Sequence, residues 1–174
     1  MKHLLIVVDM QKDFVDGALG TPEAVAIVDN VCAKIHNFNG DIIVTYDTHH
    51  QDYMNTREGK HLPVPHCIKG TPGWELDAKI QTALSEKSYH IIEKPTFGSV
   101  TLPEYVKKHY SPSELKIELI GLCTDICVVS NALLLKANFP ETDIAVDSTC
   151  TAGVTPESHE AALTTMKMCQ ITIR

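Results

Sequence analysis

The sequence lacks a long apolar run and a surplus of basic residues. No stretch approaches the roughly 18 consecutive apolar residues of a membrane-spanning helix, so we expect no membrane span. Fifteen Lys and Arg stand against 22 Asp and Glu, which gives a formal net charge of −7. Nucleic acids and anionic membranes are bound by basic faces. The composition therefore argues against both partners.

The N-terminal segment and the cysteines give no sign of export. The apolar run Leu4–Val8 is too short for a signal peptide and ends at Asp9 without a cleavage site of small residues. Six cysteines in 174 residues are few, and their spacing suggests no disulfide framework. We expect a cytoplasmic protein with reduced thiols.

Internal repeats, low-complexity tracts and linkers rich in Pro or Gly are also missing. The chain has 44% hydrophobic and 21% charged residues, which is typical of a globular protein. Its length fits one domain. We expect a single domain over residues 1–174.

Short apolar runs alternate with amphipathic stretches along the chain. We expect strands over residues 4–8, 41–46, 89–92, 116–120, 143–146 and 170–173, and helices over 22–38, 75–85, 101–110, 125–138 and 155–168. This alternation predicts a three-layer α/β/α doubly wound sandwich with a mostly parallel sheet of about six strands. The irregular stretch 47–74 is long enough to suggest a function.

Polar residues that follow the strands are candidates for a site, because ligands bind outside the carboxyl ends of the strands in such sheets. Asp9 follows the first strand, Lys94 the third, and Cys127 lies beyond the fourth. A carboxylate beside a thiol can act as a general base, with a pKa set by burial and by a nearby cation. Each residue alone has a plainer reading: a turn cap, a solvated lysine and an inert buried cysteine. Together they indicate a nucleophilic site.

Cys127 should lie near a helix start. If Asp125 or Thr124 caps that helix, the thiol faces free backbone N–H groups in the first turn. These groups stabilise a thiolate and could hold an oxyanion beside the sulfur.

A second cluster contains aspartate and histidine. Asp47 and His49 are two residues apart, which places their side chains on one face of an extended segment. With His66 they form a ligand set that suits Zn²⁺, Fe²⁺ or Mn²⁺. A polar surface loop that happens to contain histidine is the plainer alternative.

Taken together, these motifs resemble the isochorismatase-like cysteine hydrolases, and within them the nicotinamidase branch. The resemblance covers nearly the whole chain. It is carried by Val-Asp9-Met-Gln-x-Asp-Phe14, Asp47-x-His49, Pro-x-His66-Cys-x-x-Gly-Thr-x-Gly, Glu-Lys94 and Gly121-x-x-Thr-Asp-x-Cys127-Val.

The resemblance implies an Asp9–Lys94–Cys127 triad. It also implies a cis peptide before Cys123, with the Cys123 and Cys127 amides forming the oxyanion hole. The substrate pocket is expected to include Phe14, Leu122 and Ile126.

A divalent metal is implied as well, most simply zinc, with iron or manganese as alternatives. Asp47, His49 and His66 match the ligand pattern of the nicotinamidase branch. Glu58 is the expected fourth ligand, and Asp52 and His61 stay open.

The expected activity is hydrolysis of nicotinamide to nicotinate and ammonia through a thioester, as in NAD salvage. The segment after Lys94 is short, and the tryptophan that often precedes Pro-x-His is missing, with Trp74 lying beyond it. Another small amide, such as an N-carbamoyl or ureido compound, is therefore an open alternative, as is a metal-free isochorismatase-like hydrolase. A ligand-binding or thiol-redox protein without catalysis is the third reading. Relatives in the family suggest a homo-oligomer.

Overall fold

The computed structural model describes residues 1–174 and contains one sheet of six parallel strands. The strand order is β3-β2-β1-β4-β5-β6. The strands are β1 (Lys2–Val8), β2 (Asp41–Asp47), β3 (Tyr89–Lys94), β4 (Leu115–Leu122), β5 (Asp143–Ala152) and β6 (Thr172–Ile173). The chain reverses its direction of travel across the sheet between β1 and β4, so the carboxyl ends of these two strands flank a crevice.

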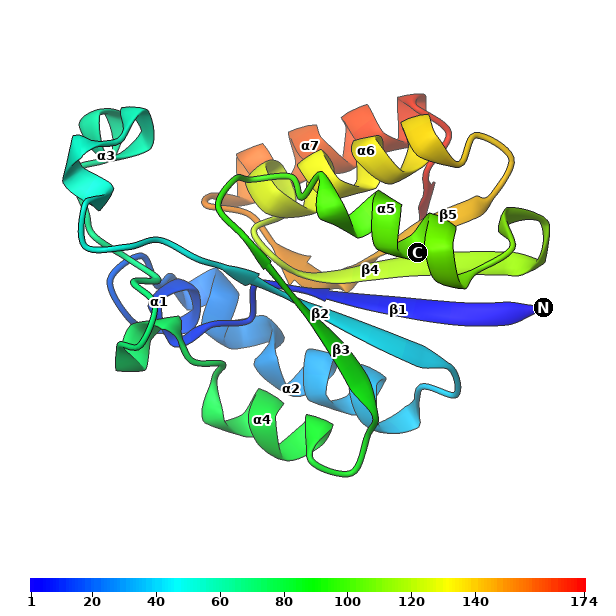
Figure 1. The fold of residues 1–174 in the computed structure, drawn as a ribbon, viewed down its shortest axis with the longest axis horizontal. Helices are drawn as coiled ribbons and strands as arrows, with labels where there is room; N and C mark the ends of the chain where they lie inside the picture. The colour runs from blue at the N-terminus through cyan, green and yellow to red at the C-terminus, as the bar shows by residue number, and fades with distance from the viewer.

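Helices cover both faces of this sheet (Figure 1). On one face lie α2 (Pro22–Asn37) and α4 (Ala78–Leu84), and on the other α5 (Thr101–His109), α6 (Val129–Asn138) and α7 (Pro156–Met168). The short α1 (Lys12–Val15) follows β1 directly. The predicted three-layer, doubly wound fold is thus confirmed, and the sheet is parallel throughout.

Alternation along the strands divides the core between the two faces. Leu4, Ile6 and Val8 of β1 pack into the cluster beneath α5, α6 and α7, whereas Leu5 and Val7 pack into the cluster beneath α2 and α4. The side chains of Leu4–Val8 in β1 are buried on both faces, which is why this part of the strand is a continuous apolar run.

Local sequence signals explain most helix boundaries. Thr21 caps α2 by accepting a hydrogen bond from the Ala24 N–H at 3.0 Å, and Pro22 takes the first helical position. The helix predicted from residue 75 begins instead at Ala78, because the Asp77 carboxylate caps the N–H groups of Lys79 and Ile80.

The fifth strand differs most from its predicted bounds. It extends to Ala152 rather than to Val146, because its register against β4 shifts between Leu119 and Gly121 and pairing then resumes at Thr151. Polar residues in this second half obscure the strand in the sequence.

The stretch from Thr48 to Trp74 contains only short helical segments: a 3-10 turn at Tyr53–Asn55, α3 (Arg57–His61) and a second 3-10 turn at Pro72–Trp74. Figure 1 shows α3 standing away from the sheet. The later part of this stretch pairs with its start through an isolated bridge, in which the His49 N–H donates to the Cys67 carbonyl at 2.9 Å.

No helix has both the length and the apolar character needed to cross a membrane. All six cysteines are free thiols.

Candidate active site and metal centre

The Lys94 ammonium connects the predicted acid and the predicted nucleophile. Its Nζ lies 2.6 Å from Asp9 Oδ2 and 3.4 Å from the Cys127 sulfur. Asp9 and Lys94 are almost completely buried, and Cys127 is 4% exposed. Three residues that lie far apart in the sequence thus form one compact cluster.

Asp9 is held in place by its neighbours on β2. The Thr45 hydroxyl donates to Asp9 Oδ1 at 2.7 Å, and the Asp9 N–H donates to the Thr45 carbonyl at 3.2 Å. Asp9 has a φ of 46°, a left-handed conformation that is uncommon outside glycine. The backbone therefore turns sharply at Asp9, directly after β1, and the carboxylate stays at the end of the strand.

Burial dominates the electrostatics of the triad. It raises the pKa of the Asp9 carboxyl, and the Lys94 charge limits that rise. Burial alone would lower the pKa of Lys94, but the negative charge of Asp9 and its neighbours raises it, so the ammonium stays protonated. Burial and the Asp9 charge raise the pKa of the Cys127 thiol well above its ordinary value. The resting sulfur is consequently a thiol that needs a base.

The chain around Cys127 differs from the simple helix start that we predicted. Thr124–Val128 is a π-helical turn that precedes α6, as the Val128 N–H donates to the Cys123 carbonyl five residues back. Cys123, rather than Asp125 or Thr124, is the N-cap residue. The cap prediction was wrong because both side chains bind elsewhere: Asp125 accepts from the Val154 N–H, and Thr124 pairs with His159.

The peptide bond between Leu122 and Cys123 is cis, in agreement with the resemblance. Gly121 just before it has a φ of 113°, and a Cβ there would collide with the Val8 carbonyl oxygen. Only glycine allows β4 to approach the end of β1 so closely at this point. The motif glycine thereby brings the Cys127 segment next to Asp9.

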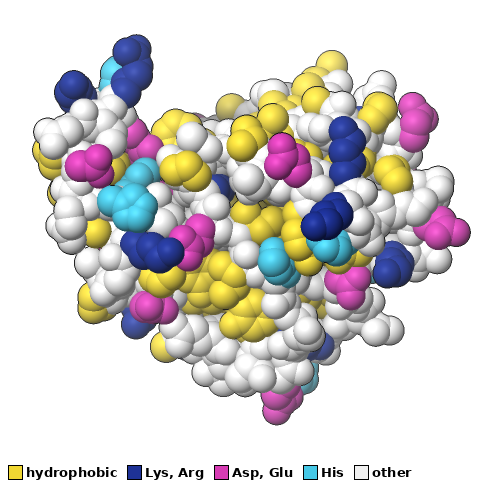
Figure 2. Space-filling model, in the orientation of Figure 1, with side chains coloured by type: hydrophobic (Ala, Val, Ile, Leu, Met, Phe, Trp, Pro, Cys, Tyr) yellow, Lys and Arg dark blue, Asp and Glu magenta, His cyan; other side chains and the backbone are white.

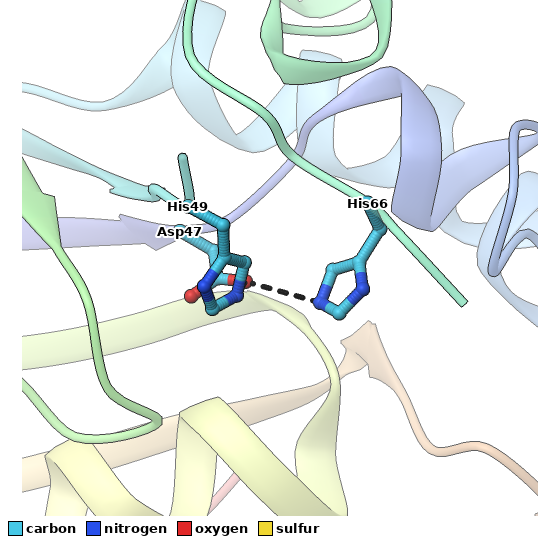
Figure 3. Close-up of side chains that lie close together, drawn as sticks. All are labelled: Asp47, His49 and His66. Carbon is cyan, nitrogen blue, oxygen red and sulfur yellow. Dashed lines mark hydrogen bonds and ion pairs between the residues drawn. The ribbon is translucent and has the colours of Figure 1, made fainter. Parts of the chain in front are cut away.

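Asp47, His49 and His66 form the second cluster (Figure 3). Asp47 Oδ2 lies 3.0 Å from His49 Nε2 and 3.5 Å from His66 Nε2. The three possible ligand atoms lie within 4.8 Å of one another, and all three residues are buried. Such a convergence of one carboxylate and two imidazoles fits a divalent transition metal.

Glu58 lies beside this cluster, and its role as the fourth ligand stays a prediction. Its Oε1 lies 3.5 Å from the Nε2 atoms of both His49 and His66. Asp52 is exposed, and the exposed His61 ring bonds to the Arg57 carbonyl of its own helix. Glu58 lies on α3, outside the sheet, so the spacing of residues along the sequence does not show that it faces His66.

The orientation of His66 and the two carboxylates around its Nε2 suit a ligand role. Its Nδ1 hydrogen-bonds to the Val64 carbonyl at 2.8 Å, which leaves Nε2 directed at Asp47 and Glu58. Burial lowers the pKa of His66, but hydrogen bonds to these two carboxylates outweigh it and raise the pKa to about 10. Hydrogen bonds from the two imidazoles overcome burial and lower the pKa of Asp47. The cluster thus carries two carboxylates that attract a cation.

The three predicted pocket residues lie in different settings. The Phe14 ring is half-buried with its centroid 5.5 Å from that of His66, so it borders the second cluster. Ile126 is half-buried next to Cys127, whereas Leu122 is fully buried in the core beneath α2. A substrate-contacting role for each stays a prediction, with Phe14 the best placed.

Asn131 was missing from the sequence prediction. This fully buried side chain donates to the Cys127 carbonyl at 2.8 Å and accepts from the Ser99 N–H at 2.9 Å. It therefore ties the helix of Cys127 to the segment after Lys94. The signal that could have revealed it is an amide in the first turn of the helix, close to the apolar run Ala132–Leu135.

A cavity of about 980 Å³ lies away from both clusters, beside α2. It is lined by Lys34, Glu118 and Asp147 among others and includes no residue of either cluster. Lys34 already pairs with both carboxylates there, so this cavity does not compete as the site of chemistry.

Comparisons with known proteins find relatives along nearly the whole chain. The family model described as the isochorismatase domain matches residues 3–174. The nicotinamidase/pyrazinamidase of Mycobacterium tuberculosis is 27% identical over 185 residues, which cover 96% of this chain and 95% of that protein.

Two solved structures share the fold over almost their whole length. The crystal structure of nicotinamidase PncA from Bacillus subtilis has a TM-score of 0.84 and 26% identity, with 99% of each chain covered. The pyrazinamidase of Pyrococcus horikoshii, solved in complex with zinc, has a TM-score of 0.82 and 28% identity, with 100% of this chain and 99% of that chain covered.

Proposed function

Because this chain belongs to the isochorismatase domain family, we propose that it is a cysteine amidohydrolase that converts nicotinamide to nicotinate and ammonia. The observation that carries the proposal is the Lys94 ammonium, placed 2.6 Å from Asp9 and 3.4 Å from the Cys127 sulfur. The similarity of this chain to nicotinamidases along its whole length supports the choice of nicotinamide as the substrate.

Catalysis begins with transfer of the Cys127 thiol proton to Asp9. Burial raises the pKa of both groups, and the Lys94 charge opposes that rise for each of them. As the substrate arrives, the Asp9 carboxylate takes the thiol proton as a general base. Lys94 keeps its charge throughout and stabilises the thiolate that forms.

The thiolate then attacks the carboxamide carbon and forms a tetrahedral intermediate. The backbone N–H groups of Cys123 and Cys127 hold its oxyanion, a contribution of about 3 kcal/mol per donor in other hydrolases. Asp9 returns the proton to the departing nitrogen, ammonia leaves, and a thioester remains on Cys127. Asp9 next takes a proton from water as the water oxygen attacks the thioester. The C–S bond then breaks, the carboxylic acid leaves, and Asp9 returns the proton to the Cys127 sulfur.

The donor set of the second cluster fits zinc, with iron and manganese as alternatives. Asp47, His49, His66 and Glu58 would hold the ion, which would supply a Lewis-acid anchor for the ring nitrogen of the substrate. Phe14, beside His66, would pack against the ring.

The substrate is tested by measuring ammonia release from nicotinamide, pyrazinamide and a panel of N-carbamoyl and ureido compounds. We expect nicotinamide to give the highest kcat/KM. A clear preference for a ureido compound would assign the other small-amide activity instead.

The nucleophile is tested with Cys127→Ala, which should abolish ammonia release. Cys150→Ala removes another buried thiol, which lines the cavity beside α2 rather than the triad, and is the matched control. With wild-type protein, mass spectrometry of a quenched reaction should show an acyl adduct on the peptide that contains Cys127. Full activity of Cys127→Ala would refute the assignment.

We also propose that the protein is cytoplasmic and self-associates. Figure 2 shows hydrophobic side chains gathered on the face where β3 forms the edge of the sheet. Exposed apolar residues from this region include Tyr89, Ile91, Phe97 and Val100. Light scattering coupled to gel filtration gives the mass in solution, and a monomer at micromolar concentration would contradict self-association.

A further inference from the structure

The side chain of Gln11 acts as an extra peptide group beyond the end of β1. The pairing of β1 with β2 ends at Val8 and Thr45. Beyond this point, the backbone N–H and carbonyl of Asp47 in β2 need other partners. Gln11 Oε1 accepts from the Asp47 N–H at 2.8 Å, and Gln11 Nε2 donates to the Asp47 carbonyl at 2.8 Å. The backbone of β1 no longer pairs with β2 at Asp47. The fully buried Gln11 carboxamide takes its place and satisfies the N–H and the carbonyl of Asp47.

Asp13, two residues later, makes the corresponding contact with the other segment. Its Oδ2 accepts from the Cys67 N–H at 2.8 Å, directly after His66. Cys67 has a φ of 46°, so the chain turns sharply at this point and exposes that N–H to the carboxylate. Asp13 thereby fixes the backbone next to a candidate metal ligand.

A third contact joins Trp74, at the end of the irregular stretch 48–74, to Gln11. Gln11 Nε2 also donates to the Trp74 carbonyl at 2.9 Å. A Cβ at the neighbouring Gly73 would collide with the Asp13 carboxyl atoms. A side chain at this position would therefore displace the Asp13 carboxylate from its contact with the Cys67 N–H.

We propose that Gln11 and Asp13 are positioning residues that hold Asp47 and His66 at the separation a metal ion requires. This inference rests on the proposed metal site and deepens it. The two ligands come from a strand end and from a stretch with only short helical segments, so the fold by itself does not fix their distance. Both are instead attached to one short segment that starts directly after Asp9.

Residues outside the ligand sphere that orient ligands typically change metal affinity by 10- to 100-fold when they are replaced. Gln11→Met keeps the length of the side chain and removes all three hydrogen bonds, and Asp13→Ala removes the acceptor for Cys67. We expect each to raise the Zn²⁺ dissociation constant of the metal-depleted protein by about 10- to 100-fold, measured by competition with a chromogenic chelator. Asp13→Asn retains one acceptor oxygen and should lie closer to wild type than Asp13→Ala.

Thr142→Val is the matched control, since it removes a buried side-chain hydrogen bond to the Pro112 carbonyl far from the clusters. It should lower stability without changing the Zn²⁺ dissociation constant. If Gln11→Met does not fold, Gln11→Glu removes only the two donated hydrogen bonds and keeps the acceptor for Asp47.

Amide hydrogen exchange of the metal-depleted proteins separates this inference from the proposed metal function. We expect faster exchange around residues 47–50 in Gln11→Met and around residues 64–70 in Asp13→Ala, but not in Thr142→Val. If wild-type protein fails to bind Zn²⁺, the metal proposal is wrong, and the exchange rates still decide the positioning role. The positioning role would be overturned if the folded variants exchanged their amides at wild-type rates and had Zn²⁺ dissociation constants within twofold of wild type.

Discussion

Asp47 Oδ1 lies 3.5 Å from Lys94 Nζ, and Asp47 Oδ2 lies 3.0 Å from His49 Nε2. This one side chain therefore borders the triad and the candidate metal cluster at the same time. Since both clusters are buried, a change of charge in one acts on the other through little intervening water. The triad and the candidate metal cluster are therefore parts of a single electrostatic unit.

Replacement of Lys94 by Met should reduce both activity and stability. The change leaves Asp9 buried without its cation, and breaking such a pair typically costs about 3–5 kcal/mol. We expect loss of ammonia release and a fall of this size in the free energy of unfolding, measured with urea. The double variant Asp9→Asn/Lys94→Met should recover part of the stability but none of the activity. Equal stability of the single and double variants would contradict the pairing.

Removal of metal should weaken substrate binding more than it slows the chemical step. After dialysis against a chelator, we expect KM for nicotinamide to rise about tenfold or more, since about 1.4 kcal/mol of lost interaction corresponds to a factor of ten. Zn²⁺ added back in stoichiometric amount should restore KM. An unchanged KM in the metal-depleted enzyme would argue against an anchoring role.

Gly121→Ala should destabilise the fold through backbone conflict at the site. Its positive φ and the contact with the Val8 carbonyl oxygen leave no room for a Cβ. We expect a loss of about 3 kcal/mol or more in the free energy of unfolding. Gly70→Ala is the control, because Gly70 also has a positive φ but no atom lies within 4 Å of the point that a Cβ would occupy, and about 1 kcal/mol is expected there. Similar losses in both variants would show that the close approach to β1 is unimportant.

The ion pairs of Lys34 predict a pH window of stability. Lys34 Nζ lies 2.7 Å from Asp147 and 3.1 Å from Glu118, and Arg174 also faces Glu118 at 3.5 Å. Burial raises the pKa of Asp147, but hydrogen bonds from Lys34 and Thr149 outweigh it and lower that pKa. Burial lowers the pKa of Lys34, but both carboxylates outweigh it and raise that pKa.

The depressed carboxyl contributes stability above its unfolded pKa of about 3.9, which is lost as the pH falls through the folded value. The raised ammonium contributes stability below its unfolded pKa of about 10.4, which is lost as the pH rises through the folded value. The difference in unfolding free energy between wild type and Lys34→Met should therefore be constant from about pH 5 to 9 and shrink on either side. A difference that grows in acid would refute the assignment.

The order of strands and helices was predictable because β-branched runs and amphipathic stretches differ in their periodicity. Thr21 with Pro22 marked the start of α2, and the apolar run at Leu4–Val8 marked a strand buried on both faces. The second half of β5 was missed because pairing resumes there after a register shift, and a shift in pairing leaves no periodic signal.

The candidate site divides in the same way. Residue type and position at strand ends pointed to Asp9, Lys94 and Cys127, and residue type and spacing pointed to Asp47, His49 and His66. The motif resemblance added Glu58. Neither indicated that Asn131 holds the Cys127 helix or that Cys123, rather than Asp125, begins it, since these depend on which partner reaches each polar group first in the folded chain.

By itself, the sequence determined which chemical groups this protein can use and that a parallel sheet would bring their strand ends to one edge. The tertiary structure alone decided that Glu58, on a helix away from the sheet, faces His49 and His66, and that Gln11 and Asp13 fasten two remote segments. The physical reason is that strand periodicity is set by neighbours along the chain. A distance between atoms in separate loops is set only when hydrogen bonds between them form in the complete fold.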